Sequence, residues 1–190
     1  DTRINVEVSH MISDGRGTLA FFKTLLRAYV EERYGDRCVI GQRGAEQVRR
    51  SEDSYTANYD KKAAGSDKAH KVYRLTGWKN TAEPTFMEYH ISASAVHSAA
   101  HARGVTVTSL IIAAVMKAIV LTMPSTKHQR AITIGIPVDL RALFESETAR
   151  NFFGMAYVSL LPADQQKSLD EIASIVQKQL KAATRPEAIK

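Results

Sequence analysis

The chain has 190 residues, of which 44% are hydrophobic and 24% are charged, and this balance is typical of a soluble globular chain with one ordinary domain or two small lobes. It excludes a disordered chain and a collagen, and the absence of a fixed sequence period excludes a solenoid. The single cysteine, Cys38, excludes a disulfide framework and a cysteine-rich zinc site. The formal net charge of +6 favours anionic partners without specifying their kind.

We expect no targeting segment within the printed sequence. The chain begins Asp-Thr-Arg-Ile, without an initiator methionine, a basic leader or an apolar signal core, so we expect a fragment of a longer cytoplasmic protein that continues on both sides. The longest apolar run, residues 107–123, is shorter than a bilayer span and contains Lys117. We therefore expect a buried core helix there and no membrane partner.

The first 40 residues are predicted to form the end of an N-terminal lobe, as strand, loop and helix. Residues 4–8 alternate apolar and polar side chains with β-branched residues, which predicts a strand. Ser13 or Asp14 can cap a helix from about residue 16 to residue 33, and Gly35 is expected to end it.

Residues 41–84 are polar and basic and have almost no apolar periodicity, which predicts an exposed crossover that links two lobes. Within it, we expect a helical turn at residues 51–59 and a short strand at residues 72–75.

Residues 85–190 are predicted to form an incomplete C-terminal lobe in which helices alternate with strands. The expected strands are 86–91, 131–136 (stopped by Pro137) and 152–161, and the expected helices are 93–103, 108–122 and one that starts at the capping box 168–171. The helix at 108–122 is hydrophobic nearly all round, so it must be covered on most sides. This order predicts an α/β class, in the form of an α+β two-layer sandwich with a mixed sheet and packed helices.

A His-x-x-x-Asp-Gly string stands where the first predicted strand gives way to the helix, at His10, Asp14 and Gly15. A strand end can hold an imidazole beside a cleft, and its ordinary pKa of about 6.5 leaves it able to accept a proton at neutral pH. Gly15 permits a positive φ or a close backbone approach. The string alone leaves open that Asp14 is a helix cap and His10 a turn residue.

A second motif lies far along the chain. Residues 136–141 (Ile-Pro-Val-Asp-Leu-Arg) and 149–154 (Ala-Arg-Asn-Phe-Phe-Gly) resemble the second signature of the chloramphenicol acetyltransferase-like superfamily, whose first signature is His-x-x-x-Asp-Gly. That superfamily includes condensation domains of peptide synthetases, and the chain is most similar to bacterial alcohol acetyltransferase-like proteins. The chain resembles only the middle-to-late part of a typical member.

The resemblance implies a role for each matching residue. His10 matches the general base, and Asp14 matches a structural carboxylate that pairs with an arginine, here Arg141. Gly15 belongs to the same structural group at the active site. The reaction implied needs no metal and no covalent enzyme intermediate. The candidate residues of the substrate channel are Ser9, Ser13, Asn151 and Gly154.

The function that the resemblance implies is transfer of an acyl group, most simply acetyl from acetyl-coenzyme A, onto an alcohol, with amine acceptors left open. Coenzyme A thioester and a small-molecule acceptor are the expected partners, and no permanently bound cofactor is expected. Two alternatives remain: a condensation-type domain that uses carrier-protein thioesters, and a non-catalytic interaction module on the same scaffold. Without the preceding half-lobe, the chain is expected either to fold incompletely or to self-associate through an unpaired sheet edge.

Three other features are interpreted as structural. His97 and His101 have a spacing that can bind a metal, but no acidic neighbour completes a ligand set, which favours surface histidines. Cys38 is expected to be a structural thiol. The basic crossover, with Tyr55, Tyr59 and Tyr73, is predicted to be a solvated linker without a nucleic-acid partner.

Overall fold

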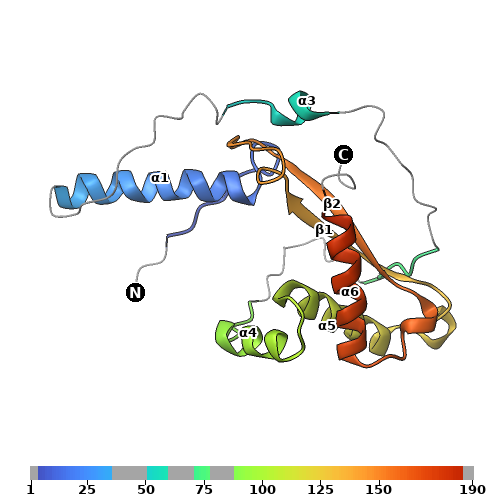
Figure 1. Cartoon of the computed structure of the whole chain (residues 1–190). Helices are drawn as coiled ribbons and strands as arrows, with labels where there is room; N and C mark the ends of the chain where they lie inside the picture. Colours follow the sequence, from blue (N-terminus) through green and yellow to red (C-terminus); the bar gives the residue numbers. More distant parts are fainter. Residues whose placement is uncertain (1–3, 36–50, 60–70, 78–87, 186–190) are drawn as a thin grey trace. The chain divides into compact units, whose positions relative to one another are not determined.

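The computed structural model describes residues 4–35, 51–59, 71–77 and 88–185, and these form two compact units (Figure 1). The first unit comprises the described residues within 1–64 and 137–155, and the second those within 65–136 and 156–189. Both units are assembled from segments that are separate in the sequence. The predicted lobes 1–40, 41–84 and 85–190 stay a prediction.

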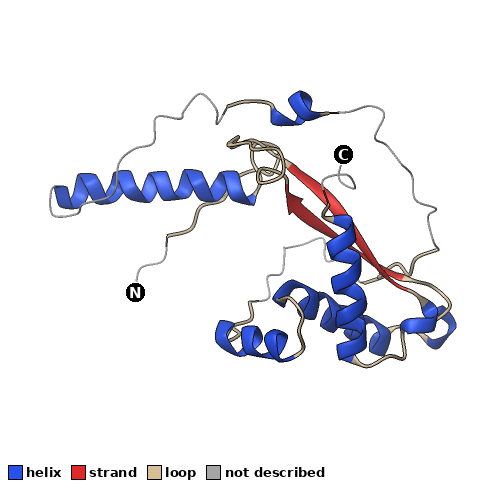
Figure 2. Cartoon of the chain, in the orientation of Figure 1, coloured by secondary structure: helices blue, strands red, loops and turns tan. Residues whose placement is uncertain are grey.

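The described chain has the predicted mixed α/β composition, in an α+β form. Two strands, β1 (Ile132–Asp139) and β2 (Phe153–Leu160), pair as an antiparallel two-stranded sheet (Figure 2). The helices are α1 (Gly15–Tyr34), α3 (Ser54–Asn58), α4 (Ala93–Ala102), α5 (Val107–Thr122) and α6 (Leu169–Ala183), with short 3-10 turns at Ser125–Lys127 and Pro162–Asp164.

The second unit has an apolar core built from α5, α6 and the sheet. Every third or fourth residue of α5 turns inward, and the strands contribute alternate residues, as the two periodicities require. The buried side chains are those of Ile112, Ala113, Met116, Val120, Met123, Ile132, Val158, Leu160, Ile172, Ala173 and Val176.

Helix α5 is less covered than its composition predicts. Ile111, Val115 and Leu121 on its other side are exposed. The expectation of a helix covered on most sides is therefore wrong, because in this structure α5 packs against α6 on one side only and the small helix α4 contacts it less extensively. Among the described residues, no single helix is long and apolar enough to cross a membrane. Helices α4 and α5 reach the required length and hydropathy only when they are taken together, and the pair is bent by 89°.

Helix ends match the sequence prediction because they depend on local chemistry. Asp14 caps α1, and Gly35 follows its end with a positive φ of 54°. Ser168 and Glu171 form the predicted capping box of α6. Ser92 caps the start of helix α4, and the helix stops before Gly104, whose φ of 64° suits a glycine.

Strand predictions fail where no partner strand is available. Residues 4–8 and the described part of the 86–91 segment, 88–91, are not strands, since no described strand lies beside them to complete a hydrogen-bonded ladder. The expected strand at 72–75 is reduced to one parallel bridge between Val72 and Ala131. In contrast, β1 continues through Pro137 to Asp139, because a two-stranded sheet has only edge strands, where a proline is tolerated.

One described part of the crossover, residues 51–59, is mostly exposed but makes specific contacts with the rest of the first unit. It forms the predicted helical turn, α3, and the side chain of Ser54 is 2% exposed. The Thr148 hydroxyl donates to the carbonyl of Glu52, and the hydroxyls of Ser54 and Ser146 lie 2.7 Å apart. The predicted exposure therefore holds for this segment except at Ser54, and the polar contacts that dock it have no apolar pattern in the sequence.

Candidate active site

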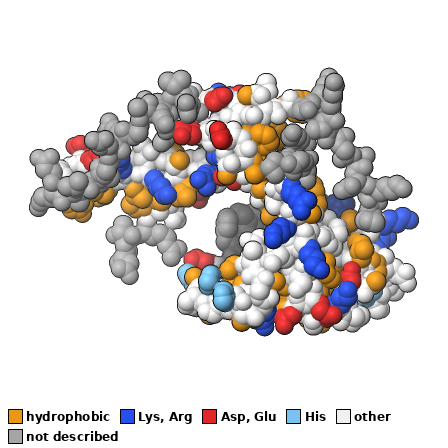
Figure 3. Space-filling view, viewed as in Figure 1, with side chains coloured by type: hydrophobic (Ala, Val, Ile, Leu, Met, Phe, Trp, Pro, Cys, Tyr) orange, Lys and Arg blue, Asp and Glu red, His pale blue; other side chains and the backbone are white. Residues whose placement is uncertain are grey.

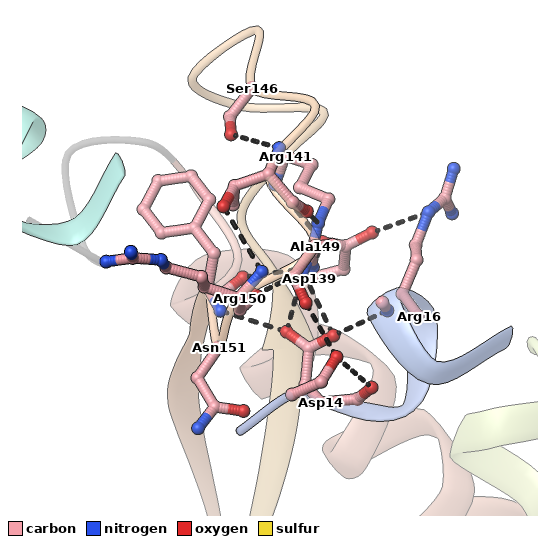
Figure 4. Close-up of polar contacts among 12 residues, drawn as sticks. Asp14, Arg16, Asp139, Arg141, Ser146, Ala149, Arg150 and Asn151 are labelled. Atoms are coloured by element: carbon pink, nitrogen blue, oxygen red, sulfur yellow. Dashed lines mark hydrogen bonds and ion pairs between the residues drawn. The ribbon is translucent and has the colours of Figure 1, made fainter. Parts of the chain in front are cut away.

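Arg141 is the centre of a buried polar network in the first unit, which we call the Arg141 network (Figure 4). Its guanidinium donates to the carbonyl oxygens of Thr148 (2.8 Å), Arg150 (2.7 Å) and Phe152 (3.5 Å). It also donates to the carboxylates of Asp14 and Asp139, and Arg141 as a whole is only 8% exposed. A planar fork of five N–H groups suits this arrangement, and a lysine has no equivalent geometry.

Asp14 joins the start of α1 to this network. Arg141 Nη2 lies 3.0 Å from Oδ1 and 2.9 Å from Oδ2 of Asp14, although the two residues are 127 positions apart. The same carboxylate accepts from the backbone amides of Gly17 and Phe152, both at 2.9 Å. The sequence left two interpretations of Asp14 open, a helix cap and an arginine partner. In the structure Asp14 has both roles.

The pKa of Asp14 lies below the ordinary value of an aspartate. Burial raises the pKa of Asp14, but the amides of Gly17 and Phe152 and then the Arg141 guanidinium outweigh burial and lower it. Because its four hydrogen bonds hold the ionised form, this carboxylate is poorly suited to accept a proton during a reaction.

Two hydrogen bonds tie the turn at residues 9–13 to the strip 149–151, and Gly17 at the start of α1 also lies against the strip. Ser13 Oγ donates to the Ala149 carbonyl at 2.6 Å, and Asn151 Nδ2 donates to the His10 carbonyl at 2.8 Å. A Cβ atom on Gly17 would collide with the Ala149 carbonyl oxygen and with Ser13 Oγ. The strip thus fixes the backbone on both sides of the His-x-x-x-Asp-Gly string.

Gly17, and not Gly15, is the glycine that this packing requires. Gly15 is the first residue of α1, it does not have a positive φ, and a Cβ there would meet open space. The prediction of a special backbone role for Gly15 is therefore wrong. The motif gave no signal for Gly17, since the close approach comes from a segment more than 130 residues away.

Asn151 has one amide atom engaged and one unsatisfied. Its Nδ2 holds the His10 carbonyl, whereas Oδ1 is buried without a hydrogen-bond partner in the described part of the chain. A buried oxygen without a hydrogen bond reduces the stability of the fold. Asn151 therefore holds the His10 turn at some expense of folding free energy.

His10 lies at the surface of the first unit and lines a pocket. The pocket has a volume of about 190 Å³, and its other lining residues include Asp14, Arg16, Asp139, Arg141 and Phe153. The imidazole is exposed and makes an edge contact with Phe153, with ring centres 5.8 Å apart. It has no hydrogen-bond partner among the described residues, so its nitrogens are open to a reactant. Arg16 Nε, at the rim, pairs with Asp139 Oδ2 at 3.3 Å.

A second, more apolar pocket lies on the same turn. It has a volume of about 370 Å³ and is lined by Val8, Ile12, Ser13, Gly17, Thr18, Phe21, Ala149 and Arg150.

The four candidate channel residues lie in different places. Ser13 borders the apolar pocket, and its hydroxyl donates to the Ala149 carbonyl. Ser9 shapes the turn by accepting from the Met11 amide at 3.4 Å and from the Ile12 amide at 2.9 Å. Asn151 contacts the His10 turn, and Gly154 lies within β2.

Sequence reasoning missed two members of the Arg141 network besides Gly17. Asp139 was part of the quoted motif but had no assigned role, and it bridges Arg141 and Arg16. Thr148 is 2% exposed and links α3 to the network through its hydroxyl and carbonyl. Cys38 and the basic pairs at 49–50 and 61–62 lie outside the described residues. Within the described ranges, no group of three or more His, Cys, Asp or Glu residues could hold a metal ion.

Comparison with known proteins gives a class for this fold and site. A family model described as phthiocerol/phthiodiolone dimycocerosyl transferase C-terminus matches residues 91–188, more than half of the chain. The chain belongs to this family, the C-terminal part of a PapA acyltransferase of the condensation-domain and chloramphenicol acetyltransferase-like superfamily. No curated protein and no solved structure matches at a significant level. The matched range contains Arg141 and Asn151, while His10 and Asp14 precede it.

Proposed function

We propose that this chain transfers an acyl group from a thioester to an alcohol, with His10 as the general base. Family membership indicates acyl transfer at the level of reaction class. The observation that carries the assignment of His10 is its exposed imidazole on a pocket beside the buried Asp14 and Arg141 pair. Both parts of the superfamily motif thus meet at one cavity of the first unit.

The chemistry requires one proton acceptor beside the two reactants. Neutral His10 would take the hydroxyl proton of the acceptor while the oxygen attacks the thioester carbonyl. Collapse of the tetrahedral intermediate breaks the carbon–sulfur bond, and the imidazolium returns the proton to the leaving thiolate. Asp14 does not compete for this role because its carboxylate is held ionised by Arg141 and by two backbone amides.

We propose coenzyme A thioester as the donor, with acetyl as the simplest acyl group, as in alcohol acetyltransferase-like proteins. The formal net charge of +6 supports an anionic donor, and Arg16 at the rim of the His10 pocket is largely exposed, although it also pairs with Asp139. A carrier-protein thioester offers the same reactive carbonyl and a phosphate, and therefore remains the competing donor.

A longer acyl group is a second candidate. The pocket of about 370 Å³ beside the turn has almost wholly apolar walls, including Val8, Ile12 and Phe21. The family description names a mycocerosyl transferase, which supports an apolar acyl chain in place of acetyl. Burial of each methylene in such a pocket contributes about 0.8 kcal/mol.

The test is an assay of thiol release from acetyl-, octanoyl- and palmitoyl-coenzyme A, and from acylated carrier protein, in the presence of alcohols. We expect His10→Ala to reduce the rate by about 10²–10⁴-fold, the usual contribution of a general base. His90→Ala is the matched control, because His90 is also exposed but belongs to the second unit, where it pairs with Glu88. Unchanged transfer by His10→Ala would contradict the mechanism, and a cooperatively folded wild-type protein that is inactive with every donor would contradict the proposed activity of this chain.

A further inference from the structure

Two histidines outside the candidate active site lie together on α4. His97 and His101 are separated by four residues, so their side chains project from the same face of the helix. Their ring centres are 6.4 Å apart, and the ring planes are inclined by only 20°. Both side chains are exposed, and Figure 3 shows histidines at the surface of this part of the second unit.

We propose that His97 and His101 form a two-histidine site for a transition-metal ion that prefers imidazole nitrogen, namely Cu²⁺, Ni²⁺ or Zn²⁺. Imidazole binds such ions at about 2.0–2.1 Å. Sharing one ion requires the ring centres to approach by roughly 1–2 Å, which rotation about χ1 and χ2 at exposed positions provides. The helix thus presents both ligands in nearly the geometry that chelation needs.

The backbone under the two histidines is held in place before any ion binds. Ser92 caps the start of α4, Ala100 is buried against the rest of the unit, and Arg103 at the helix end pairs with Asp170 at 2.7 Å. Because the helix is already formed, little conformational entropy is lost when the second imidazole binds. Because the helix holds both imidazoles near each other, they bind one ion as a chelate and do not act as two independent weak sites.

The ligand set also defines which ions are excluded. No group of three potential ligand residues exists among the described residues, so the remaining coordination positions are left to water or to a small exogenous ligand. Ca²⁺ and Mg²⁺ require several oxygen ligands, which this pair does not supply. Among nitrogen-preferring ions, the affinity is expected to be highest for Cu²⁺.

The experiment is isothermal titration of the tag-free protein with each ion alone, above the ordinary imidazole pKa of about 6.5. We expect one Cu²⁺, Ni²⁺ or Zn²⁺ ion per chain, and no binding of Mg²⁺ or Ca²⁺. Either His97→Ala or His101→Ala should weaken binding by about 100-fold, since each leaves a single ligand. His90→Ala, which removes an exposed histidine before α4, should leave the affinity unchanged.

A relocated ligand tests the geometry separately from the number of histidines. The double variant His101→Ala with Ala102→His keeps two histidines on α4, five residues apart and on different faces. We expect it to bind as weakly as His101→Ala alone, with an unchanged helical circular dichroism spectrum. Bound Ni²⁺ should also slow amide hydrogen exchange within 93–102 in the wild type only. Equal affinity of the relocated variant and the wild type, or retained binding after His97→Ala, would overturn the proposal.

Discussion

The apolar core of the second unit and the Arg141 network of the first unit are held together by different physics. In the core, eleven side chains from α5, α6, the residue after α5 and the sheet are buried together. Each one contributes to the free energy of folding in proportion to the apolar area that it removes from water. In the Arg141 network, one guanidinium serves two carboxylates and three carbonyl oxygens. A core of this kind tolerates a change of shape, whereas the network depends on one side chain of one geometry.

The directional network is better suited than the apolar core to position a reacting group. Non-directional packing fixes volume and leaves many sequences acceptable, but it does not aim a polar group at a reactant. Directional hydrogen bonds fix the turn 9–13 against the strip 149–151, and this turn carries the exposed imidazole of His10. The four predictions that follow test whether this contrast is real.

The largest effect is expected from removal of one partner of the buried ion pair. Asp14→Ala leaves the Arg141 guanidinium with an unpaired face and should reduce the free energy of unfolding by about 3–5 kcal/mol. Arg141→Lys should also destabilise, although it keeps the charge, because an ammonium cannot bind the same five acceptors. Urea unfolding measures both changes. In the core, Ile172→Val should cost only about 0.5–1.5 kcal/mol, and a cost for Arg141→Lys below that range would contradict the contrast.

The next effect distinguishes two glycines of one motif. Gly17→Ala places a methyl group against the Ala149 carbonyl and Ser13 Oγ, and it should cost about 1–3 kcal/mol. Gly15→Ala is the matched control, because open space surrounds that position at the helix start, and it should be neutral or stabilising by up to about 1 kcal/mol. Thermal unfolding of the two variants gives the comparison, and equal destabilisation would show that Ala149 does not lie against the helix start.

A smaller effect on stability, with a visible effect on rate, is expected at Asn151. Asn151→Asp is nearly isosteric but removes the Nδ2 donor that holds the His10 carbonyl. Loss of this hydrogen bond should cost about 0.5–1.5 kcal/mol of stability. If acyl transfer occurs as proposed, kcat should fall by about tenfold, equivalent to about 1.4 kcal/mol, while KM changes little. Asn151→Ser, which restores a donor, should recover part of the rate, and full activity of Asn151→Asp would exclude a positioning role.

The smallest effect is the dependence of stability on pH. Because the pKa of folded Asp14 is lowered, its ionised form contributes stability at every pH above the unfolded-state pKa of about 3.9, and this contribution is lost as pH falls through the folded-state pKa. We expect Asp14→Asn to flatten the fall of Tm with acidification. Glu171→Gln in the second unit is the comparison variant: the Ser168 side chain and then its amide lower the pKa of Glu171, so the same flattening is expected, but to a smaller extent because this carboxyl is exposed. A steeper acid dependence in Asp14→Asn would contradict the assigned direction.

Elements with local causes could be predicted from the sequence. The ends of α1 and α6 follow from Asp14, Gly35 and the Ser168 capping box, and their hydrogen bonds span three or four residues. Strands require a partner, so the alternation at 4–8 was insufficient, and Pro137 did not stop β1. The buried residues of α6, Ile172, Ala173 and Val176, recur at the helical period, which is a local pattern of the same kind.

The candidate site was only partly predictable for the same reason. The pairing of Asp14 with Arg141 came from resemblance to a superfamily, since no local pattern links residues 127 positions apart. Three other features depend on contacts between distant parts of the chain and have no sequence signature. They are the close approach at Gly17, the ion pairs of Asp139 and the hydrogen bond from Thr148 to Glu52. His10 was found because a superfamily motif contains it, and its catalytic role stays a prediction.

A double-mutant cycle between Asp14 and Arg141 measures whether the two side chains stabilise the fold as a pair. The free energy of unfolding is measured for the wild type, Asp14→Asn, Arg141→Met and the double variant. If the buried pair ties the start of α1 to the strip that carries Asn151, the double variant should be less destabilised than the sum of the single variants, with a coupling energy of about 2–3 kcal/mol. Additive effects, with a coupling energy near zero, would contradict the account and would detach the His10 turn from Arg141.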